Sequence, residues 1–322
     1  MRRALVVGIN NYPTSPLRAC INDASAFGNT IETHGDGDPN FAVMLRTDVP
    51  TKGQLSELVD KLFNCDDEVA LFYFSGHGFE NDLGTYLVTP DASKNDVGLS
   101  MTDLLVMANK SKAKNRVIIL DCCHSGAAGT SPITGGSITS INTGVTILTA
   151  SKSDEAAIEV NGHGVFTNLL LDALQGGAAD IRGEITPGSI YAYIDQALGI
   201  WDQRPVFKTN ITEFISLRKI NAKVPKETLR KITKYFKAPE EHFPLDPSYE
   251  DTNSEEVKHE LVQPYADENN VAVFKDLQKF QSVGLVVPVD APYMYFAAME
   301  SKACRLTALG YHYWRLVQQK KI

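Results

Sequence analysis

Two short segments combine cysteine, histidine and glycine in a pattern that could support nucleophilic chemistry. Residues 118–126 read IILDCCHSG, and residues 74–78 read FSGHG. Each segment ends an apolar run of the kind found in buried strands. A cysteine beside a histidine can form a thiolate–imidazolium pair, which is the attacking species in thiol proteolysis. The pattern predicts a catalytic site if the fold brings Cys123 and His77 together.

The elements that must position these residues alternate between strands and helices. Apolar runs rich in β-branched and aromatic residues predict strands at 4–9, 41–45, 69–74, 117–120, 144–151 and 213–217. Helical patterns lie between or after them, at about 19–34, 52–64, 101–110, 165–177 and 186–198. This alternation predicts an α/β fold with a mostly parallel central sheet and helices on both faces.

Ligands of open parallel α/β sheets bind beyond the carboxyl ends of the strands. His77 follows the third predicted strand and Cys123 follows the fourth, so both should lie at one edge if these strands are neighbours. Gly76 and Gly78 would allow a tight turn around the histidine, and the N–H groups of Gly78 and Cys123 are candidates for an oxyanion hole. Alternatively, Cys123 is a small buried residue and His77 a satisfied loop histidine. Their joint placement after apolar strands and beside glycines favours the catalytic interpretation.

Three segments resemble the caspase-like cysteine peptidases, and in particular the metacaspase branch with its bacterial forms. They are FSGHG at 74–78, DCCHSG at 121–126 and ALVVGINNYPTSPLRACINDASAF at 4–27. They follow the order of that family within residues 1–217. The resemblance implies a caspase–hemoglobinase fold and endopeptidase activity, with Cys123 as the nucleophile and His77 as the general base. Cys122 matches a variable position, where a small buried residue is the simpler interpretation.

The resemblance also implies an acidic pocket for the residue before the scissile bond, and cleavage after Arg or Lys. The matching positions in this sequence are Asp23, Asp121, Ser75 and Cys20. Two carboxylates in a partly buried cleft repel each other unless a cation lies between them. A guanidinium can satisfy both through charge-assisted hydrogen bonds. As alternatives, Asp23 could be a helix N-terminal charge and Asp121 a loop cap.

The charge of the chain is unevenly distributed. The net charge is −8 over 322 residues, and residues 1–219 carry 17 Lys and Arg against 25 Asp and Glu, whereas residues 220–322 carry 14 of each. This balance disfavours nucleic acid as a partner and favours a cationic substrate. The five cysteines are irregularly spaced, which argues against a disulfide framework. No C-x-x-C pair indicates zinc.

Calcium is a regulator that the resemblance to metacaspases brings into consideration. The carboxylates of residues 90–96 and of Asp103 are the candidate ligands. Their spacing does not match an EF-hand loop, and we therefore expect no metal and no other cofactor.

The composition changes in the last third of the chain. Residues 220–261 are expected to form a helix and then an acidic, proline-rich linker. Residues 262–322 resemble a winged helix, with FKDLQKFQSVGLV followed by a β-like pair and CRLTALGYHYW. This module has seven Lys and Arg against five Asp and Glu, and its candidate recognition helix places Asp276 between Lys275 and Lys279. That is little charge for neutralising phosphates, so contact with a protein is favoured over contact with DNA.

The sequence therefore predicts a cysteine endopeptidase that cuts protein substrates at exposed Arg or Lys. The resemblance implies an effector in bacterial defence or regulated cell death, activated by a protein partner through the C-terminal module. The alternative is a DNA-binding regulator with a winged helix and a non-catalytic caspase-like scaffold. No apolar run approaches the length of about 18 residues that spans a membrane, and the N-terminus lacks the features of a signal peptide. We therefore expect a cytoplasmic protein without membrane contact.

Overall fold

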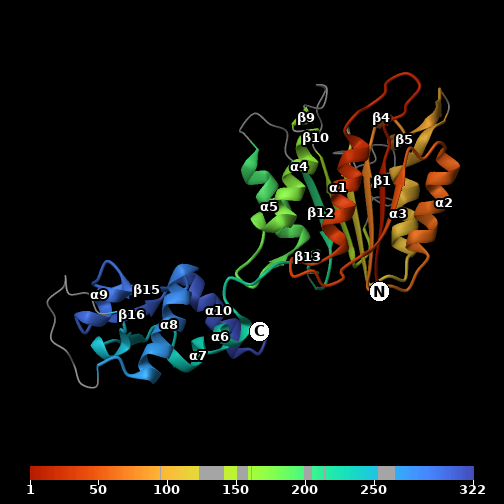
Figure 1. Ribbon diagram of the computed structural model, residues 1–322. Helices are drawn as coiled ribbons and strands as arrows, with labels where there is room; N and C mark the ends of the chain where they lie inside the picture. Colours follow the sequence, from red (N-terminus) through yellow and green to blue (C-terminus); the bar gives the residue numbers. More distant parts are fainter. Residues whose placement is uncertain are drawn as a thin grey trace. The chain divides into compact units, whose positions relative to one another are not determined.

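The computed structural model describes residues 1–94, 96–122, 141–150, 159–160, 162–198, 205–213, 215–252 and 265–322. Cys123, the predicted nucleophile, lies outside these residues. The chain divides into two compact units, Met1–Asn221 and Ala222–Ile322 (Figure 1). The division falls close to the boundary that the sequence predicted at residue 219.

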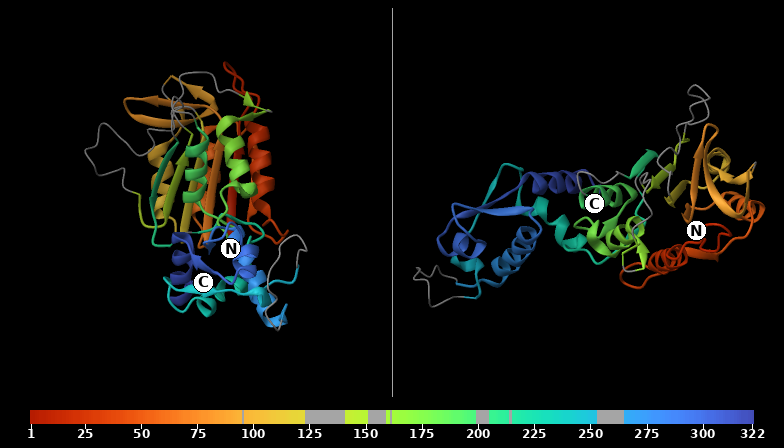
Figure 2. Two further views of the ribbon diagram at one scale, coloured as in Figure 1. Left: turned by 90° about the vertical axis from the view of Figure 1, so that its left-hand side faces the viewer. Right: turned by 90° about the horizontal axis from the view of Figure 1, so that it is seen from above.

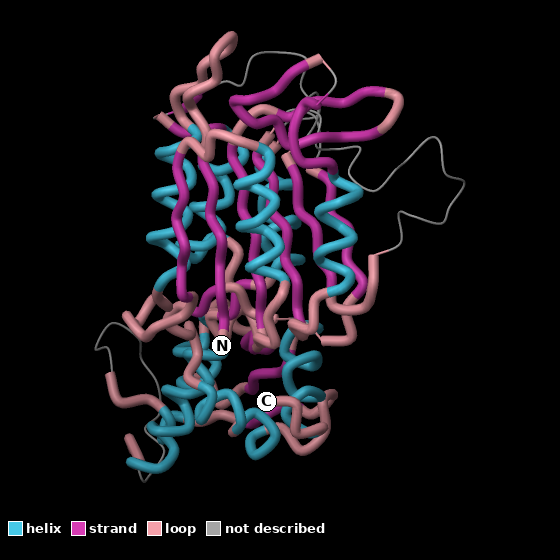
Figure 3. The backbone as a smooth tube through the Cα atoms, turned by 90° about the vertical axis from the view of Figure 1, so that its right-hand side faces the viewer, coloured by secondary structure: helices cyan, strands magenta, loops and turns pink. Residues whose placement is uncertain are grey.

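A central sheet forms the core of the first unit and, over the described residues, has the strand order β12-β8-β7-β3-β1-β2. The strands are β1 (Arg2–Gly8), β2 (Ala42–Thr47), β3 (Val69–Ser75), β7 (Asn115–Asp121), β8 (Val145–Thr149) and β12 (Val206–Asn210). β12 runs antiparallel to β8, and the pairs among the other strands are parallel. Figure 3 shows these strands running alongside one another. The sheet has the mostly parallel form that the sequence predicted.

The last strand of this sheet is not where the sequence predicted it. The prediction was 213–217, whereas the structure has β12 at Val206–Asn210. β12 is an edge strand, only partly buried, in which Val and Phe precede Lys, Thr and Asn. It therefore lacks the continuous apolar run of a strand that is buried on both faces. Leu217 is buried because it packs in the core between sheet and helices, and its N–H donates to the carbonyl of Ile185.

Helices cover both faces of the sheet (Figures 1 and 2). One face carries α1 (Cys20–Glu32), α4 (Val165–Asp172) and α5 (Pro187–Ala197), and the other carries α2 (Lys52–Phe63) and α3 (Met101–Lys110). A short π-helical turn, η2 (Ala173–Gly177), continues α4. Side chains alternate between the faces along each strand: Val6 and Tyr73 lie in the core under α1, whereas Leu5 and Phe72 lie in the core under α2.

Local sequence signals explain where several helices begin. Thr51 precedes α2 and its side chain accepts the N–H of Gln54, and Ser100 precedes α3 and accepts the N–H of Asp103. α5 begins after Thr186 with a capping box and has a proline in its first turn. These helices agree with the sequence prediction to within a few residues.

Smaller sheets lie at both ends of the parallel strands. β4 (Gly78–Asn81), β5 (Gly84–Ser93) and β6 (Asp96–Ser100) form an antiparallel sheet that follows β3. β9 (Glu159–Val160) pairs with β10 (His163–Gly164), and β11 (Glu184–Ile185) pairs with β13 (Arg218–Lys219). Figure 1 shows β4, β5, β9 and β10 beyond the carboxyl ends of the parallel strands, and β13 at the opposite end of the sheet. A parallel sheet is expected to bind its ligand at the carboxyl ends of its strands.

The second unit combines helices with a small antiparallel sheet of order β14-β16-β15. Its described elements are α6 (Lys226–Arg230), α7 (Ile232–Tyr235), β14 (His242–Pro244), the 3₁₀ turn η3 (Pro247–Tyr249), α8 (Glu268–Ser282), β15 (Val286–Val289), α9 (Met294–Met299), β16 (Ala303–Leu306) and α10 (Ala308–Gln318). Of the β-like pair predicted at 286–299, the first strand corresponds to β15, whereas the second falls on the helix α9. The partner of β15 is β16, which lies later in the chain. A winged-helix assignment of this unit stays a prediction.

Residues 222–252 belong to this second unit. The helix predicted after residue 220 corresponds to α6 and α7, whereas the part predicted as a linker contains β14 and η3. β14 pairs with β16, and Trp314 Nε1 donates to the carbonyl of Phe236 at 2.7 Å. Charged residues and prolines are frequent in this segment, so its few buried apolar residues gave a weak signal. They are Val224, Leu229, Ile232, Phe236 and Leu245.

Candidate active site

The register of two neighbouring strands brings the histidine and cysteine segments to one edge of the sheet. Ser75 at the end of β3 pairs with Asp121 at the end of β7, and the N–H of Gly76 donates to the carbonyl of Asp121 at 3.3 Å. His77 and Cys123 each lie two positions beyond this pair in the sequence. The neighbouring strands that the site requires are therefore present. Contact between the two side chains stays a prediction, because Cys123 lies outside the described residues.

The imidazole of His77 is held by the loop that follows β1. Its Nε2 lies 2.7 Å from the carbonyl oxygen of Ser15. A carbonyl oxygen can only accept, so Nε2 carries the proton and Nδ1 is left as the basic atom. The ring also packs against Tyr12, with ring centroids 4.5 Å apart, and Tyr12 Oη accepts the backbone N–H of His77 at 3.0 Å. One ring nitrogen is thus available for general-base chemistry.

The close approach of Tyr12, and not the tight turn that was predicted, requires a glycine at position 76. Neither Gly76 nor Gly78 has a positive φ, so the turn itself does not require glycine. A side-chain carbon at Gly76 would lie 2.6 Å from Tyr12 Oη, and glycine is therefore needed for the close approach of Tyr12. Gly78 begins β4, and the oxyanion hole that it would form with Cys123 stays a prediction.

Replacing Tyr12 by Phe should lower kcat for a peptide substrate about tenfold, with little change in KM. The Tyr12 hydroxyl accepts the N–H of His77 and donates to the carbonyl of Val88 at 3.2 Å. Phenylalanine keeps the ring but removes both hydrogen bonds, which costs ~1–3 kcal/mol where the N–H is buried. Steady-state kinetics and a melting curve would measure both effects, with the exposed Tyr293 changed to Phe as the control. A lower Tm with unchanged kcat would show that Tyr12 does not position His77.

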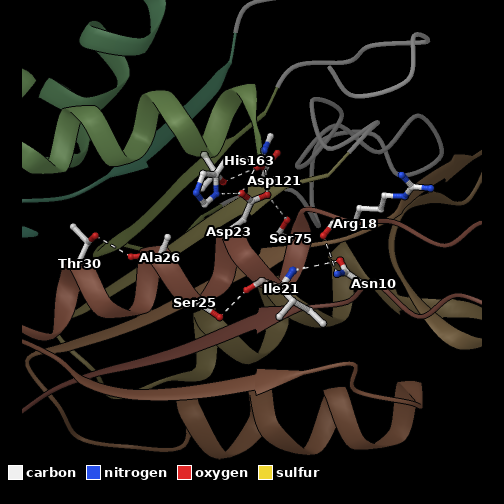
Figure 4. A network of polar contacts seen from close by, with 12 residues as sticks. Asn10, Arg18, Ile21, Asp23, Ser25, Ala26, Thr30, Ser75, Asp121 and His163 are labelled. Carbon is white, nitrogen blue, oxygen red and sulfur yellow. Dashed lines mark hydrogen bonds and ion pairs between the residues drawn. The ribbon is translucent and has the colours of Figure 1, made fainter. Parts of the chain in front are cut away.

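The predicted pocket residues gather beside the edge where β3 and β7 end (Figure 4). Asp23 lies in the first turn of α1 and is 1% exposed, and Ser75 Oγ donates to its Oδ2 at 3.4 Å. Gly164 lies between the two carboxylates, since a side-chain carbon there would be 3.1 Å from Asp121 Oδ2 and 3.4 Å from Asp23 Oδ2. Cys20 is buried and lies on the same face of α1 as Asp23, one turn earlier. The structure thus places two carboxylates and a hydroxyl together.

A chain of hydrogen bonds anchors Asp121 to the core. Thr167 Oγ1, from α4, donates to Asp121 Oδ2 at 2.5 Å, and Tyr73 Oη lies 2.6 Å from Thr167 Oγ1. Because Thr167 gives its proton to the carboxylate, Tyr73 is the donor to Thr167. Both Tyr73 and Thr167 are fully buried. The orientation of the Asp121 carboxylate is therefore set by the core.

Burial makes the ionised forms of both carboxyls unfavourable. At Asp121, desolvation is the main cause and raises the pKa to about 6; the nearby charge of Asp23 adds to this rise, and the hydrogen bond from Thr167 opposes it. At Asp23, desolvation also raises the pKa, and the hydrogen bonds that the carboxyl accepts oppose the rise. A cation between the two groups would stabilise both charges.

One segment that contacts both carboxylates was not predicted from the sequence. GHGVFT at 162–167 supplies His163, Gly164 and Thr167. His163 Nδ1 lies 2.7 Å from Asp23 Oδ1, and the N–H of Gly164 donates to the same oxygen at 3.3 Å. The sequence predicted only a helix here, from residue 165 onward. The available signal was a histidine between two glycines, as in FSGHG.

The carboxylates considered for calcium are engaged in protein contacts. Asp91 accepts the N–H of Lys52, which begins α2, and the hydroxyl of Thr89. Asp96 pairs with Lys52 Nζ at 2.9 Å, and Asp103 accepts the hydroxyl of Ser100. In the part of the chain that the structure describes, no three His, Cys, Asp or Glu residues form a group that could hold a metal ion. Regulation by calcium stays untested.

Comparison with known proteins identifies the class to which this fold and site belong. The family model of the caspase domain matches residues 1–235, and the chain belongs to this family of cysteine peptidases. The chain is similar to the solved structure of caspase-1 from Spodoptera frugiperda, with 12% identity, coverage of 68% of this chain and 90% of that chain, and a TM-score of 0.48. It is also similar to a protein from Geobacter sulfurreducens, with 16% identity, coverage of 69% and 98%, and a TM-score of 0.47.

No curated protein sequence matches the chain. The described residues contain no helix that is both long and apolar enough to span a membrane.

Proposed function

We propose that this chain is an endopeptidase that cleaves proteins after Arg or Lys, with Cys123 as the nucleophile and His77 as the general base. The observation that carries the proposal is the pair of carboxylates, Asp23 and Asp121, on either side of Gly164. They lie beside the end of the sheet where Ser75 pairs with Asp121, and His77 and Cys123 each follow this pair by two positions in the sequence. A buried pair of acids at this place favours a basic side chain and opposes an acidic one.

Each residue of the proposed site has its own step in the hydrolysis of the peptide bond. His77 Nδ1 takes the proton of the Cys123 thiol, and the thiolate attacks the carbonyl carbon of the peptide. The N–H groups of Gly78 and Cys123 stabilise the oxyanion that forms. His77 then returns the proton to the leaving amine, and water hydrolyses the acyl-enzyme with the same histidine as base. Asp23, Asp121, Ser75 and Cys20 line the pocket that holds the basic side chain.

A panel of fluorogenic peptides that differ only in the residue before the scissile bond tests this proposal. The panel contains Arg, Lys, Asp and citrulline, which has the shape of Arg without its charge. We expect kcat/KM for Arg to exceed that for citrulline by at least about 100-fold, because two buried carboxylates would lose their counter-charge. Equal cleavage of Arg and citrulline, or preferential cleavage after Asp, would contradict the proposal.

The second unit is proposed as the contact for an activating protein partner. A pocket on it is lined by Lys226, Arg230, Val317, Lys320, Lys321 and Ile322. None of these four cations has a carboxylate partner among the ion pairs of the described residues. An acidic segment of a partner is the ligand that this charge favours.

The alternative, a DNA-binding regulator, has less support. On α8, the candidate recognition helix, Lys275 pairs with Asp251 at 2.8 Å. Asp276 is buried and bonds to Lys231 and Tyr235, each at 2.7 Å. The charges of α8 are therefore largely used within the unit and leave little for phosphates. A protein that cuts none of the peptides but retards a DNA fragment in a gel would favour this alternative.

The biological setting rests on the resemblance to bacterial caspase-like peptidases. We place the enzyme in the cytoplasm, as an effector of defence or regulated cell death, without a cofactor.

A further inference from the structure

Asp23 already has a partner in the position where the proposed substrate would bind. Its Oδ1 lies 2.7 Å from His163 Nδ1 and 3.3 Å from the N–H of Gly164, and its Oδ2 accepts the hydroxyl of Ser75 at 3.4 Å. The Asp23 side chain is 2% exposed, whereas that of His163 is 24% exposed. The imidazole is therefore the more exposed member of the pair, and Figure 4 shows it beside the Asp23 carboxylate.

An imidazole and a guanidinium offer Asp23 the same kind of contact, a charge-assisted N–H donor. The imidazole and a guanidinium cannot both donate to Asp23 Oδ1 from the position that His163 Nδ1 now holds. We propose that His163 is a displaceable plug of the acidic pocket, which takes the place of the substrate's basic side chain in the resting enzyme and leaves when Arg or Lys enters. This inference rests on the proposed function, because it assumes that the pocket accepts a basic side chain.

The local structure allows the plug to leave at low cost. His163 begins β10, which pairs with β9 over two residues. It is flanked by Gly162, with φ +80°, and by Gly164, so neither residue next to it in the sequence has a side chain to restrict its rotation. When His163 leaves, Asp23 keeps its hydrogen bonds from Gly164 and Ser75. The substrate then has to replace a single contact.

Benzamidine, a small amidinium, is the probe for this competition. Its dissociation constant would be measured by NMR titration on the full-length wild type, His163→Ala and His163→Asn in one buffer. Asparagine keeps an N–H donor near the position of Nδ1 and serves as the conservative variant. We expect His163→Ala to bind benzamidine about fivefold more tightly than the wild type. The Asn variant and the wild type should agree within about twofold, and the His163 ring signal of the wild type should shift on saturation.

Three outcomes would overturn the inference. They are equal binding to wild type and His163→Ala, weaker binding to His163→Ala than to the wild type, and no binding to any of the proteins. Failure of the proposed function gives a different result. If benzamidine displaces His163 but no Arg peptide is hydrolysed, the plug exists and the peptidase proposal is wrong. If Arg peptides are hydrolysed and His163 has no effect on benzamidine, the peptidase proposal stands and the plug is wrong.

Discussion

Replacing Cys123 by Ala should reduce hydrolysis of an Arg peptide at least about 10⁴-fold. Alanine removes the sulfur that would attack the substrate and form the acyl-enzyme. The neighbouring Cys122 gives a matched control. It is 4% exposed and packs in the core under α2 and α3, so Cys122→Ala should cost about 1 kcal/mol of stability and leave kcat within a few-fold of the wild type.

Kinetic assays and melting curves on both variants would measure these effects. The assignment depends on two adjacent cysteines having opposite roles. It is wrong if Cys122→Ala abolishes hydrolysis or if Cys123→Ala retains it.

Removing either pocket carboxylate should reduce selectivity for basic residues. Asp23→Asn and Asp121→Asn are each expected to lower kcat/KM for Arg peptides about 100-fold, with a much smaller effect on the citrulline peptide. The reason is that each substitution keeps the size of the side chain and removes a charge that the guanidinium needs. Asp60→Asn, on the exposed side of α2, is the control for a lost negative charge. Equal losses for Arg and citrulline would show that the two acids serve only the structure.

The pH dependence of Asp121→Asn provides a further check on the same pocket. Because the pKa of Asp121 is raised to about 6, kcat/KM of the wild type for Arg peptides should fall as the pH decreases through that value. This limb should be absent in Asp121→Asn.

The raised pKa also predicts an effect on stability. The folded protein holds the Asp121 proton more tightly than the unfolded chain does, so stability falls as the pH rises from about 4 to about 6. Asparagine has no such loss, and at pH 7.5 the variant should melt a few degrees above the wild type. That advantage should vanish near pH 4. A variant that melts below the wild type at pH 7.5 would contradict the assignment of a strained, buried charge.

The fold could be predicted from the sequence wherever burial left a continuous apolar run. The central residues of β1, β3 and β7 are buried, and they form the apolar runs 4–7, 69–74 and 117–120. β12 was misplaced because an edge strand does not need such a run. The sheet formed by β4, β5 and β6 was missed because its strands alternate between buried and exposed residues and contain charged groups. β14 and η3 were not predicted because the few buried side chains of residues 222–252 are a small part of an otherwise polar segment.

Only the part of the site that depends on the order of the parallel strands could be predicted from the sequence. Ser75 and Asp121 are brought together by the register of β3 with β7, which follows from a parallel sheet with these strands as neighbours. Asp23 required the resemblance to a known family. His163 and Thr167 come from a distant segment, and no spacing in the sequence relates them to Asp23 or Asp121. Their part in the pocket depends on how α4 packs against the sheet, which periodicity alone does not specify.

The most direct measurement is covalent labelling by peptidyl acyloxymethyl ketones, followed by mass spectrometry of the intact and digested protein. The account predicts one adduct per chain from the reagent with an Arg side chain, located on Cys123, and no adduct from the matched Asp reagent. An adduct on another cysteine, or equal labelling by the two reagents, would contradict it.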